Sequence, residues 1–353
     1  MARVLHTGDT HIGFRQYGLE ERRADFAKAF LQIVQLARDE SVAAVIHAGD
    51  LFEDRTPGAE DLLATLQGLS ALKDAGIRFL GIVGNHEQRR GVQWLDLFAE
   101  LGLAVHLRSD RPFELEGIPI WGLDFSGRRE ITPPLCEGGV LVCHQLLDAV
   151  DIDGELALEK LVRCGARFVL MGDYHEYREW RERYNNHEIL ITYCGSTERW
   201  ALDETSPRGV SIIDLSTGRL DRRHLETRAF FYIRADEDPI QRLETSPVHG
   251  AVVVVYLASP QWTIAEIEKL GYERGALAVR IRDLRAPTES PPEPSLELEF
   301  GDIERTVTEA LARKNLSPLA RELDQIIRDL QIPDSNVDPE VTALLERAWR
   351  VKA

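Results

Sequence analysis

The 353-residue sequence lacks any apolar run long enough to cross a membrane. A membrane-spanning helix needs about 20 consecutive apolar residues, so we expect no membrane association. No charged-then-apolar leader precedes Val4 and Leu5, and the predicted location is therefore the cytoplasm. The few cysteines are Cys136, Cys143, Cys164 and Cys194. None forms a Cys-x-x-Cys pair, which predicts reduced, buried thiols rather than a zinc knuckle or a redox motif.

Positive charge is also scarce. The net charge is −17 and only six of the 42 basic residues are lysines. This balance does not favour a protein that binds nucleic acid through its overall charge. It does not exclude a local basic track, to which the loop and strand arginines could contribute. These are Arg89, Arg90, Arg128, Arg129, Arg178, Arg181 and Arg183. Phosphate contacts and ordinary surface solvation remain alternatives for each of them.

Five apolar runs end in side chains that can bind a metal. In chain order, the runs end in Asp9 and His11, Asp50, Asn85 and His86, His144, and finally Asp173 and His175. Open α/β sheets place their sites at the carboxyl ends of the strands. One Asp-x-His pair is common by chance, but five ordered strand ends are not. The sequence therefore predicts one site built from all five segments.

The donors in this set are carboxylates, imidazoles and one amide, without a thiolate. Such mixed ligands suit Mn²⁺, Fe or Zn²⁺, and the oxygen-rich balance favours Mn²⁺. The predicted ligands are Asp9, His11, Asp50, Asn85, His144, Asp173 and His175. Seven ligands exceed the need of one tetrahedral zinc. They fit two ions roughly 3.5–4 Å apart with one bridging carboxylate.

Two adjacent cations lower the pKa of a shared water and clamp the oxygens of a phosphate ester. A metal-bridging hydroxide can then attack phosphorus in line with the leaving oxygen. His86 lies beside a ligand position and is the candidate for protonating that oxygen. The residues therefore predict metal-dependent phosphoester hydrolysis.

Hydrophobic periodicity predicts an α/β fold with a two-sheet β-sandwich flanked by helices. Apolar residues at three- and four-residue steps predict helices over 20–40, 60–74 and 93–101, alternating with strands at 43–48 and 78–83. Further strands are predicted at 112–122, 139–144, 167–171, 188–193, 208–214 and 219–225, with a helix at 155–163. Residues 229–286 predict a smaller αβ domain after a first domain of residues 1–228. A Pro-rich linker over 287–300 precedes a helical tail over 301–353, which either folds back or docks on a partner.

The order Asp-x-His, Gly-Asp, Gly-Asn-His, lone His and a final Gly-x-x-His resembles the calcineurin-like metallophosphoesterases over about residues 1–225. The resemblance implies one metal at Asp9, His11, Asp50 and His175, and a second at Asp50, Asn85, His144 and Asp173, with Asp50 bridging. It also implies that His86 is the histidine that assists the leaving group without binding metal.

Longer motifs at 6–13, 21–26, 47–52 and 193–200 are similar to the SbcD-type repair nucleases. This family includes the archaeal and eukaryotic meiotic recombination eleven nucleases. The resemblance implies a 3′–5′ exonuclease on duplex ends and an endonuclease on single strands. It implies two Mn²⁺ per chain and sequence-independent contact with the DNA backbone in a double-strand-break repair complex.

The same resemblance implies roles for the other segments. The 229–286 domain would cap DNA, and the tail would bind the coiled coil of an SbcC-type (Rad-fifty type) ATPase. The helices over 60–74 and 93–101 would form a homodimer through a four-helix bundle.

One position departs from the family pattern. Gly172-Asp173-Tyr174-His175 stands where the family has Gly-His-x-His. An aspartate there favours a harder ion such as Mn²⁺, or it weakens the second metal site. This departure keeps open a scaffold that tethers DNA and the ATPase without cutting. A phosphoesterase acting on small phosphodiesters or phosphoproteins is a second alternative, because the sandwich core alone does not separate it from a nuclease.

Other polar residues near the strand ends are expected to have supporting roles. His6 and His47 alternate away from the ligand face and are predicted to be buried and structural. Glu53, Asp54 and Glu87 are predicted to be solvated or to support the ligands rather than to bind metal.

Overall fold

The computed structural model describes residues 3–127, 131–151, 154–185, 187–285 and 317–328, with Val341 and Leu344. The predicted linker and most of the predicted tail lie outside the described residues, as do Arg128 and Arg129. The chain divides into two compact units, Met1–Arg285 and Ala286–Ala353. In the second unit, the structure describes helix α8 (Pro318–Arg328). Among the described residues, no helix is long and apolar enough to cross a membrane.

The first sheet has the strand order β12-β11-β1-β2-β3-β4. Its strands are β1 (Arg3–Thr7), β2 (Ala44–His47), β3 (Arg78–Gly81), β4 (Val105–His106), β11 (Gly209–Asp214) and β12 (Arg219–His224). Strands β1 to β4 are parallel, and β11 joins β1 in antiparallel register. The parallel arrangement brings the carboxyl ends of β1, β2 and β3 to one edge.

The second sheet has the order β5-β6-β7-β8-β10-β9. Its strands are β5 (Phe113–Leu115), β6 (Ile118–Leu123), β7 (Val140–His144), β8 (Phe168–Gly172), β9 (Arg178–Tyr184) and β10 (His187–Tyr193). The predicted run 112–122 is in fact a hairpin, because Glu116 and Gly117 have φ angles of 49° and 80°. Two successive positive φ values are the geometry of a tight two-residue hairpin turn.

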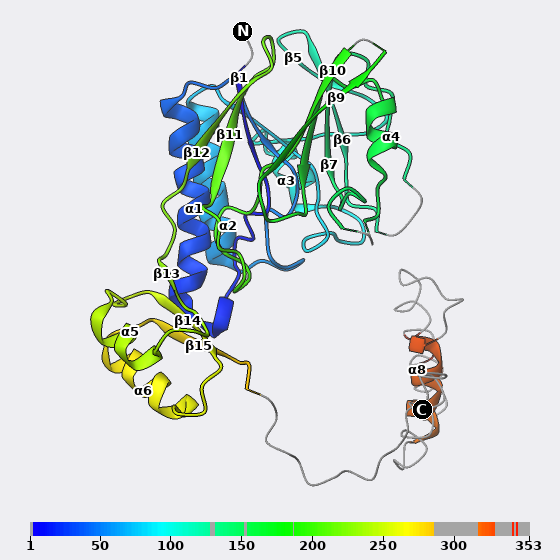
Figure 1. The fold of residues 1–353 in the computed structure, drawn as a ribbon. Helices are drawn as coiled ribbons and strands as arrows, with labels where there is room; N and C mark the ends of the chain where they lie inside the picture. The colour runs from blue at the N-terminus through cyan, green and yellow to red at the C-terminus, as the bar shows by residue number, and fades with distance from the viewer. Residues whose placement is uncertain are drawn as a thin grey trace. The chain divides into compact units, whose positions relative to one another are not determined.

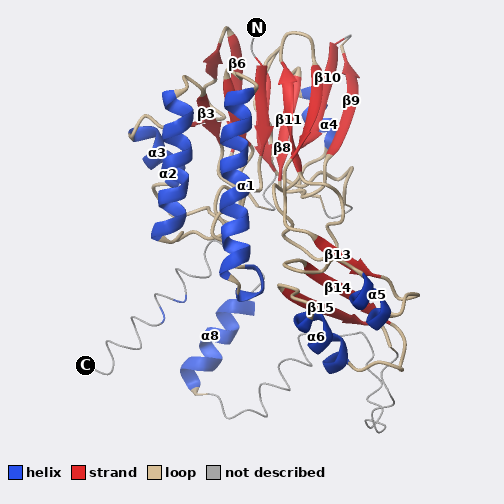
Figure 2. Cartoon of the chain, turned by 90° about the vertical axis from the view of Figure 1, so that its left-hand side faces the viewer, coloured by secondary structure: helices blue, strands red, loops and turns tan. Residues whose placement is uncertain are grey.

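Helices cover the outer faces of both sheets, as Figures 1 and 2 show. Helices α1 (Glu20–Asp39), α2 (Ala59–Asp74) and α3 (Trp94–Glu100) cover the first sheet, and α4 (Leu158–Arg163) covers the second. A separate apolar core fills the space between the two sheets. The predicted two-sheet sandwich flanked by helices is confirmed, and we call it the two-sheet body.

A three-stranded unit follows the two-sheet body within the first compact unit. Its parallel sheet has the order β13-β14-β15. The elements are β13 (Phe230–Ile233), α5 (Pro239–Thr245), β14 (Val252–Leu257), α6 (Ile264–Glu273) and β15 (Ala278–Asp283). One face of the sheet packs on the unit's helices. Its other face packs on Tyr17, Leu19 and Leu202, and the Arg280 guanidinium lies 4.2 Å from the ring centre of Tyr17.

Candidate metal centre

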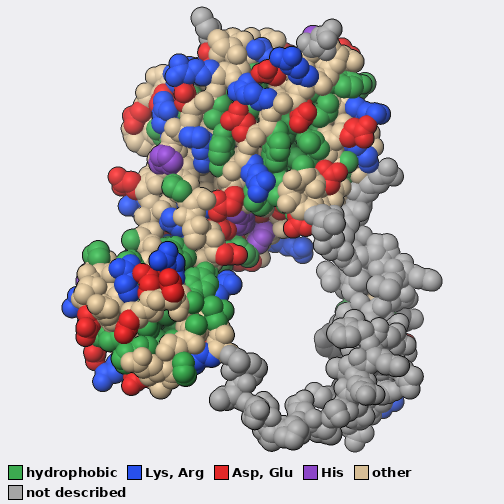
Figure 3. All heavy atoms as spheres, viewed as in Figure 1, with side chains coloured by type: hydrophobic (Ala, Val, Ile, Leu, Met, Phe, Trp, Pro, Cys, Tyr) green, Lys and Arg blue, Asp and Glu red, His purple; other side chains and the backbone are tan. Residues whose placement is uncertain are grey.

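The five predicted strand ends converge at one edge of the two-sheet body. Asp9, His11 and His175 place donor atoms within 4.8 Å of one another, and so do Asp9, Asp50 and His144. These two groups share Asp9. Figure 3 shows histidine and acidic side chains gathered at the lower edge of this body. The sequence pattern therefore located the place where titratable side chains meet.

Tight backbone turns aim these side chains at a common point. The amide of Asp9 donates to the carbonyl of Gly49 and that of His11 to the carbonyl of Asp50, each at 3.0 Å. A Cβ atom at Gly84 would lie 2.1 Å from Oδ1 of Asp50. Glycine is thus required there, because any side chain would occupy the space of this carboxylate.

Asp50 belongs to the second donor group and also approaches His11 of the first. Its Oδ2 is 3.4 Å from Nε2 of His144 and 3.9 Å from Nε2 of His11. Its Oδ1 accepts a hydrogen bond of 3.0 Å from the amide of His86. Burial opposes ionisation, but the charge and hydrogen bond of His144 and the charge of His11 hold the pKa of Asp50 below its usual range. An ionised, buried carboxylate this close to two imidazole nitrogens can serve as a metal ligand.

The His144 and His175 rings are held from behind. Nδ1 of His144 donates to the carbonyl of Ala48 at 2.7 Å, and its Nε2 lies 2.9 Å from Oδ1 of Asn85. Nδ1 of His175 donates to Oε1 of Glu204 at 2.7 Å. These Nδ1 hydrogen bonds orient both rings so that Nε2 of each points into the site, as is usual for metal-binding histidines.

Two imidazole nitrogens face each other inside the cluster. Nε2 of His11 and Nε2 of His175 are 3.2 Å apart, and Asp9 and Asp50 are at most 2% exposed. Buried carboxylates and converging lone pairs are stabilised by a cation. This donor set fits the divalent metal that the sequence predicts.

Asp173 reaches the same edge from the end of β8. Its amide donates to Oδ1 of Asp9 at 3.0 Å, and its Oδ1 lies 3.6 Å from Nε2 of His144. Burial raises the pKa of its carboxyl to about 6. Asp173 thus lies on the His144 side of the cluster, but it does not belong to either close donor group described above.

His86 lies at the rim of the cluster. Its side chain is 27% exposed, and its Nδ1 is 3.2 Å from the carbonyl oxygen of Glu53. Its ring stands edge-on to His11 at a centroid distance of 4.8 Å. An accessible histidine beside the buried donors can exchange a proton with a substrate atom.

Three residues close to the cluster are not among the ligands predicted from the sequence. Oε2 of Glu53 lies 2.8 Å from Nδ1 of His11 and accepts a hydrogen bond of 3.1 Å from the Trp200 indole. The Trp200 ring centre lies 5.6 Å from that of His175. The third residue is Glu204, which accepts the Nδ1 hydrogen bond of His175. Glu53 and Glu204 are in loops outside the strand-end pattern, while Trp200 ends the motif at 193–200.

The residues expected to be structural are buried. His6 is 0% and His47 1% exposed, and burial lowers the pKa of each to about 3. Nε2 of His47 lies 3.0 Å from Oγ1 of Thr10, behind the ligand turn. The Glu87 carboxylate accepts hydrogen bonds from the amides of Phe52 and Gly84. Its buried position corresponds to the supporting role rather than the solvated one.

Comparison with known proteins gives a family and named relatives. A family model described as calcineurin-like phosphoesterase matches residues 2–213. The chain is 39% identical to the DNA double-strand break repair protein Mre11 of Haloferax volcanii, over 98% of this chain and 82% of that protein. It is 38% identical to the protein of that name from Halobacterium salinarum, over 97% of this chain and 93% of that protein. It is 40% identical to the protein of the same name from Methanosarcina mazei, over 96% of this chain and 58% of that protein.

Proposed function

The chain belongs to the calcineurin-like phosphoesterases and, among them, to the Mre11 family of DNA double-strand break repair proteins, and from this membership we propose that it is a Mn²⁺-dependent DNA nuclease of a break-repair complex. It would act as a 3′–5′ exonuclease on duplex ends and as an endonuclease on single strands. The observation that carries the proposal is the convergence of Asp9, His11, Asp50, His144 and His175 at one edge.

We assign the ligands to two Mn²⁺ ions. One ion would be held by Asp9, His11, Asp50 and His175, and the other by Asp50, Asn85, His144 and Asp173. The closeness of Asp50 to imidazoles of both donor groups and the 2.9 Å approach of Asn85 Oδ1 to His144 Nε2 support this division. Bound ions would supply Lewis acidity toward the phosphate and lower the pKa of a water nucleophile.

The protein's own residues would orient the substrate and move the proton. His86 is the accessible imidazole of the cluster and would protonate the leaving oxygen. The Glu53 carboxylate lies 2.8 Å from Nδ1 of His11, and Trp200 closes one side of the site against His11, His86 and His175. A closed side limits the ways in which a phosphodiester can approach.

The proposed macromolecular partners are DNA, a second copy of the chain and an SbcC-type coiled-coil ATPase. DNA would be bound through its backbone, independently of sequence. Exposed Leu63 on α2, Leu97 on α3 and Leu101 just after α3 support a homodimer through these helices. The tail proposed to bind the ATPase lies mainly outside the described residues. Residues 229–286 are proposed to cap DNA.

The test is cleavage of labelled single-stranded and duplex oligonucleotides with Mn²⁺, in parallel with EDTA. Cleavage that needs Mn²⁺ and is lost in His86→Gln, while Mn²⁺ binding persists, supports the proposal. Hydrolysis of bis-p-nitrophenyl phosphate without DNA cleavage would favour the small-ester enzyme. Retained ATPase binding with no hydrolysis of either substrate would favour the scaffold.

A further inference from the structure

A buried carboxylate outside the proposed ligand set contacts the metal cluster. The side chain of Glu204 is 8% exposed, and its Oε1 accepts the Nδ1–H of His175 at 2.7 Å. In the neutral ring, a proton on Nδ1 leaves the lone pair on Nε2, the atom that lies 3.2 Å from Nε2 of His11. The Glu204 contact therefore determines which nitrogen of His175 is available to a metal.

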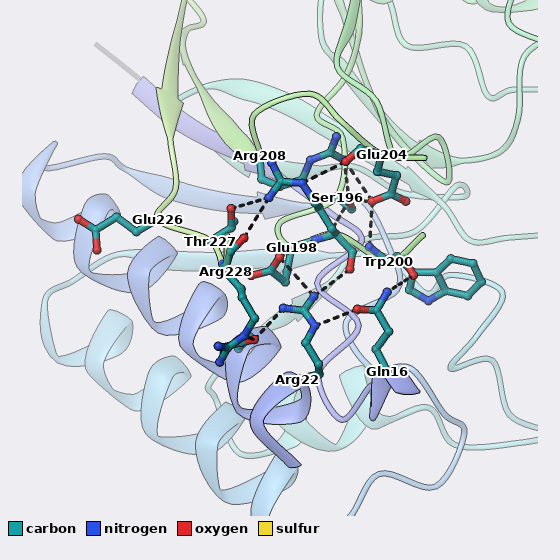
Figure 4. Close-up of polar contacts among 12 residues, drawn as sticks. Gln16, Arg22, Ser196, Glu198, Trp200, Glu204, Arg208, Glu226, Thr227 and Arg228 are labelled. Carbon is teal, nitrogen blue, oxygen red and sulfur yellow. Dashed lines mark hydrogen bonds and ion pairs between the residues drawn. The ribbon is translucent and has the colours of Figure 1, made fainter. Parts of the chain in front are cut away.

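The second oxygen of this carboxylate is fixed by its own donors (Figure 4). Oε2 of Glu204 accepts hydrogen bonds from the amide of Trp200 at 2.8 Å and from Nη1 of Arg208 at 3.4 Å. The hydroxyl of Ser196 lies 3.4 Å from the same oxygen. With both oxygens engaged, the carboxylate cannot rotate without breaking buried hydrogen bonds.

The backbone of Glu204 contacts the three-stranded unit. Its carbonyl accepts hydrogen bonds from the hydroxyl of Tyr232 in β13 at 3.4 Å and from Nε of Arg199 at 3.0 Å. Nη1 of Arg199 also donates to Oγ1 of Thr227 at 2.9 Å, just before β13. One residue thus contacts a proposed metal ligand through its side chain and the three-stranded unit through its main chain.

The fully buried Arg22 of α1 anchors the same loop (Figure 4). Its Nε donates to Oε1 of Gln16 at 2.8 Å, and its Nη2 donates to the carbonyl of Arg199 at 3.0 Å. Nε2 of Gln16 in turn donates to the carbonyl of Trp200 at 2.6 Å. The 196–204 loop is therefore held by helix α1 on one side and by β13 on the other.

From this geometry we infer that Glu204 is a positioning residue that fixes the His175 ring for metal binding. Through its main-chain contacts, Glu204 also couples the position of that ring to the position of the three-stranded unit. The inference rests on the proposed function, because it assumes that His175 binds metal. A purely structural role would stabilise the loop without changing metal affinity. The two roles are separated by measuring Mn²⁺ binding independently of catalysis.

The experiment titrates the whole chain with Mn²⁺ by calorimetry and counts bound Mn²⁺ by electron paramagnetic resonance. Glu204→Gln keeps the size of the side chain, but its single carbonyl oxygen cannot accept both from His175 and from the Trp200 amide. We expect one of the two Mn²⁺ sites to weaken by about tenfold to 100-fold, the usual effect of losing a ligand's hydrogen-bond partner.

Glu176→Gln is the matched control. Glu176 follows His175 directly and pairs with the same Arg208, at 2.6 Å, but among the described residues its side chain makes no hydrogen bond or ion pair with the His175 ring. We expect Glu176→Gln to bind both ions as the wild type does. Tyr232→Phe removes the hydroxyl that contacts the Glu204 carbonyl. We expect it to lower the Mn²⁺ affinity about twofold to fivefold at the site that Glu204→Gln weakens, relative to the exposed Tyr272→Phe.

The outcomes are distinguishable. Wild-type Mn²⁺ affinity in a folded Glu204→Gln protein overturns the inference, and an equal loss in Glu176→Gln does so as well. If Glu204→Gln fails to fold, Glu204→Asp replaces it, because it keeps the charge but withdraws the carboxylate from Nδ1. Wild-type affinity in Glu204→Asp would then reject the positioning role. Absence of Mn²⁺ binding by the wild type would instead reject the proposed function.

Discussion

At the scale of single residues, the metal cluster is built on backbone conformations that side chains seldom adopt. Asp9, His11, Asp50 and Asp173 have φ angles of 49°, 43°, 53° and 89°. Each such residue costs on the order of 1 to 3 kcal/mol and persists only where its surroundings fix it. Here the fixing contacts are hydrogen bonds between the ligand turns, such as those from Asp9 to Gly49 and from Asp173 to Asp9. The turns therefore hold the ligand geometry before any metal binds.

Asp173 gives the most direct test of the departure from the family pattern. We predict that Asp173→Ala lowers Mn²⁺-dependent cleavage of an oligonucleotide at least about 100-fold, because the second ion loses a ligand. The melting temperature without metal should be unchanged or higher, since the substitution removes one of several neighbouring carboxylates. The exposed Asp203→Ala serves as the control and should cleave as the wild type does. Undiminished cleavage by Asp173→Ala would remove this residue from the site.

His106 provides a pH-dependent contribution to stability away from the ligands. Burial alone would lower its pKa, but hydrogen bonds to Asp124 at 2.9 Å and Asp96 at 2.7 Å raise that pKa above its usual value. A histidine whose pKa is raised on folding stabilises the folded state below its unfolded pKa of about 6.5, and the effect fades as pH rises through the folded value. We predict that His106→Asn lowers the free energy of unfolding most at pH 5 to 6, and progressively less at higher pH.

Urea denaturation in EDTA at several pH values measures this effect. The exposed His224→Asn is the control and should show no such pH-dependent gap. A difference between His106→Asn and the wild type that grows with pH would contradict the assignment of a charged His106.

The sequence predicts that the five strand ends meet, because parallel strands bring their carboxyl ends to one edge whatever the loops do. It does not predict Glu204 as a partner of His175. That contact joins residues 29 positions apart, and the path of the loop between them depends on Arg22 and on β13. Glu53 was left between solvation and support for a similar reason, since its direction depends on the fold of its loop.

At the scale of elements, helices α1 and α2 approach closely at one glycine. A Cβ atom at Gly68 would lie 2.5 Å from Cε1 of Phe30 and 3.2 Å from Cγ2 of Val34, both on α1. Alanine is favoured over glycine in a helix by about 1 kcal/mol, but overpacking a core costs about 1 to 3 kcal/mol. We predict that Gly68→Ala lowers the free energy of unfolding by about 1 kcal/mol.

Urea denaturation followed by circular dichroism checks this prediction. Gln67→Ala, on the exposed side of the same helix, should change stability by less than about 0.5 kcal/mol. A Gly68→Ala protein more stable than the wild type would contradict this prediction, because it would show that α1 and α2 can accommodate the added methyl group without loss of stability.

The elements missed from the sequence share a physical reason. Strand β9 reads Arg-Glu-Trp-Arg-Glu-Arg-Tyr and has no buried residue, so it lacks the apolar alternation of a half-buried strand. It forms because all seven of its residues pair with β10. Strand β13 and helix α5 are short and depend on the neighbouring β14 and on the unit's core. Tertiary pairing therefore decides these segments, whereas α1 and α2 are visible from their own periodicity.

At the scale of the whole molecule, the two-sheet body and the three-stranded unit lie within one compact unit. The predicted boundary at residue 228 passes through an ion pair, because the Arg228 guanidinium bonds the Asp25 carboxylate of α1 at 2.5 and 2.9 Å. Composition marks the proline-rich segment but gives no sign of this long-range pair. The division into four domains remains a prediction.

The chain's stability should depend on the metal, because three proposed ligands are neighbouring carboxylates. Without a cation, Asp9, Asp50 and Asp173 repel one another in a buried place, while the unfolded chain keeps them apart. A ligand that binds only the folded state stabilises it by about 2.7 kcal/mol at a concentration 100 times its dissociation constant. We therefore predict that Mn²⁺ raises the melting temperature by several degrees and that excess EDTA reverses the rise. His144→Ala should lose most of this shift, and a full shift in that variant would place the stabilising ions elsewhere.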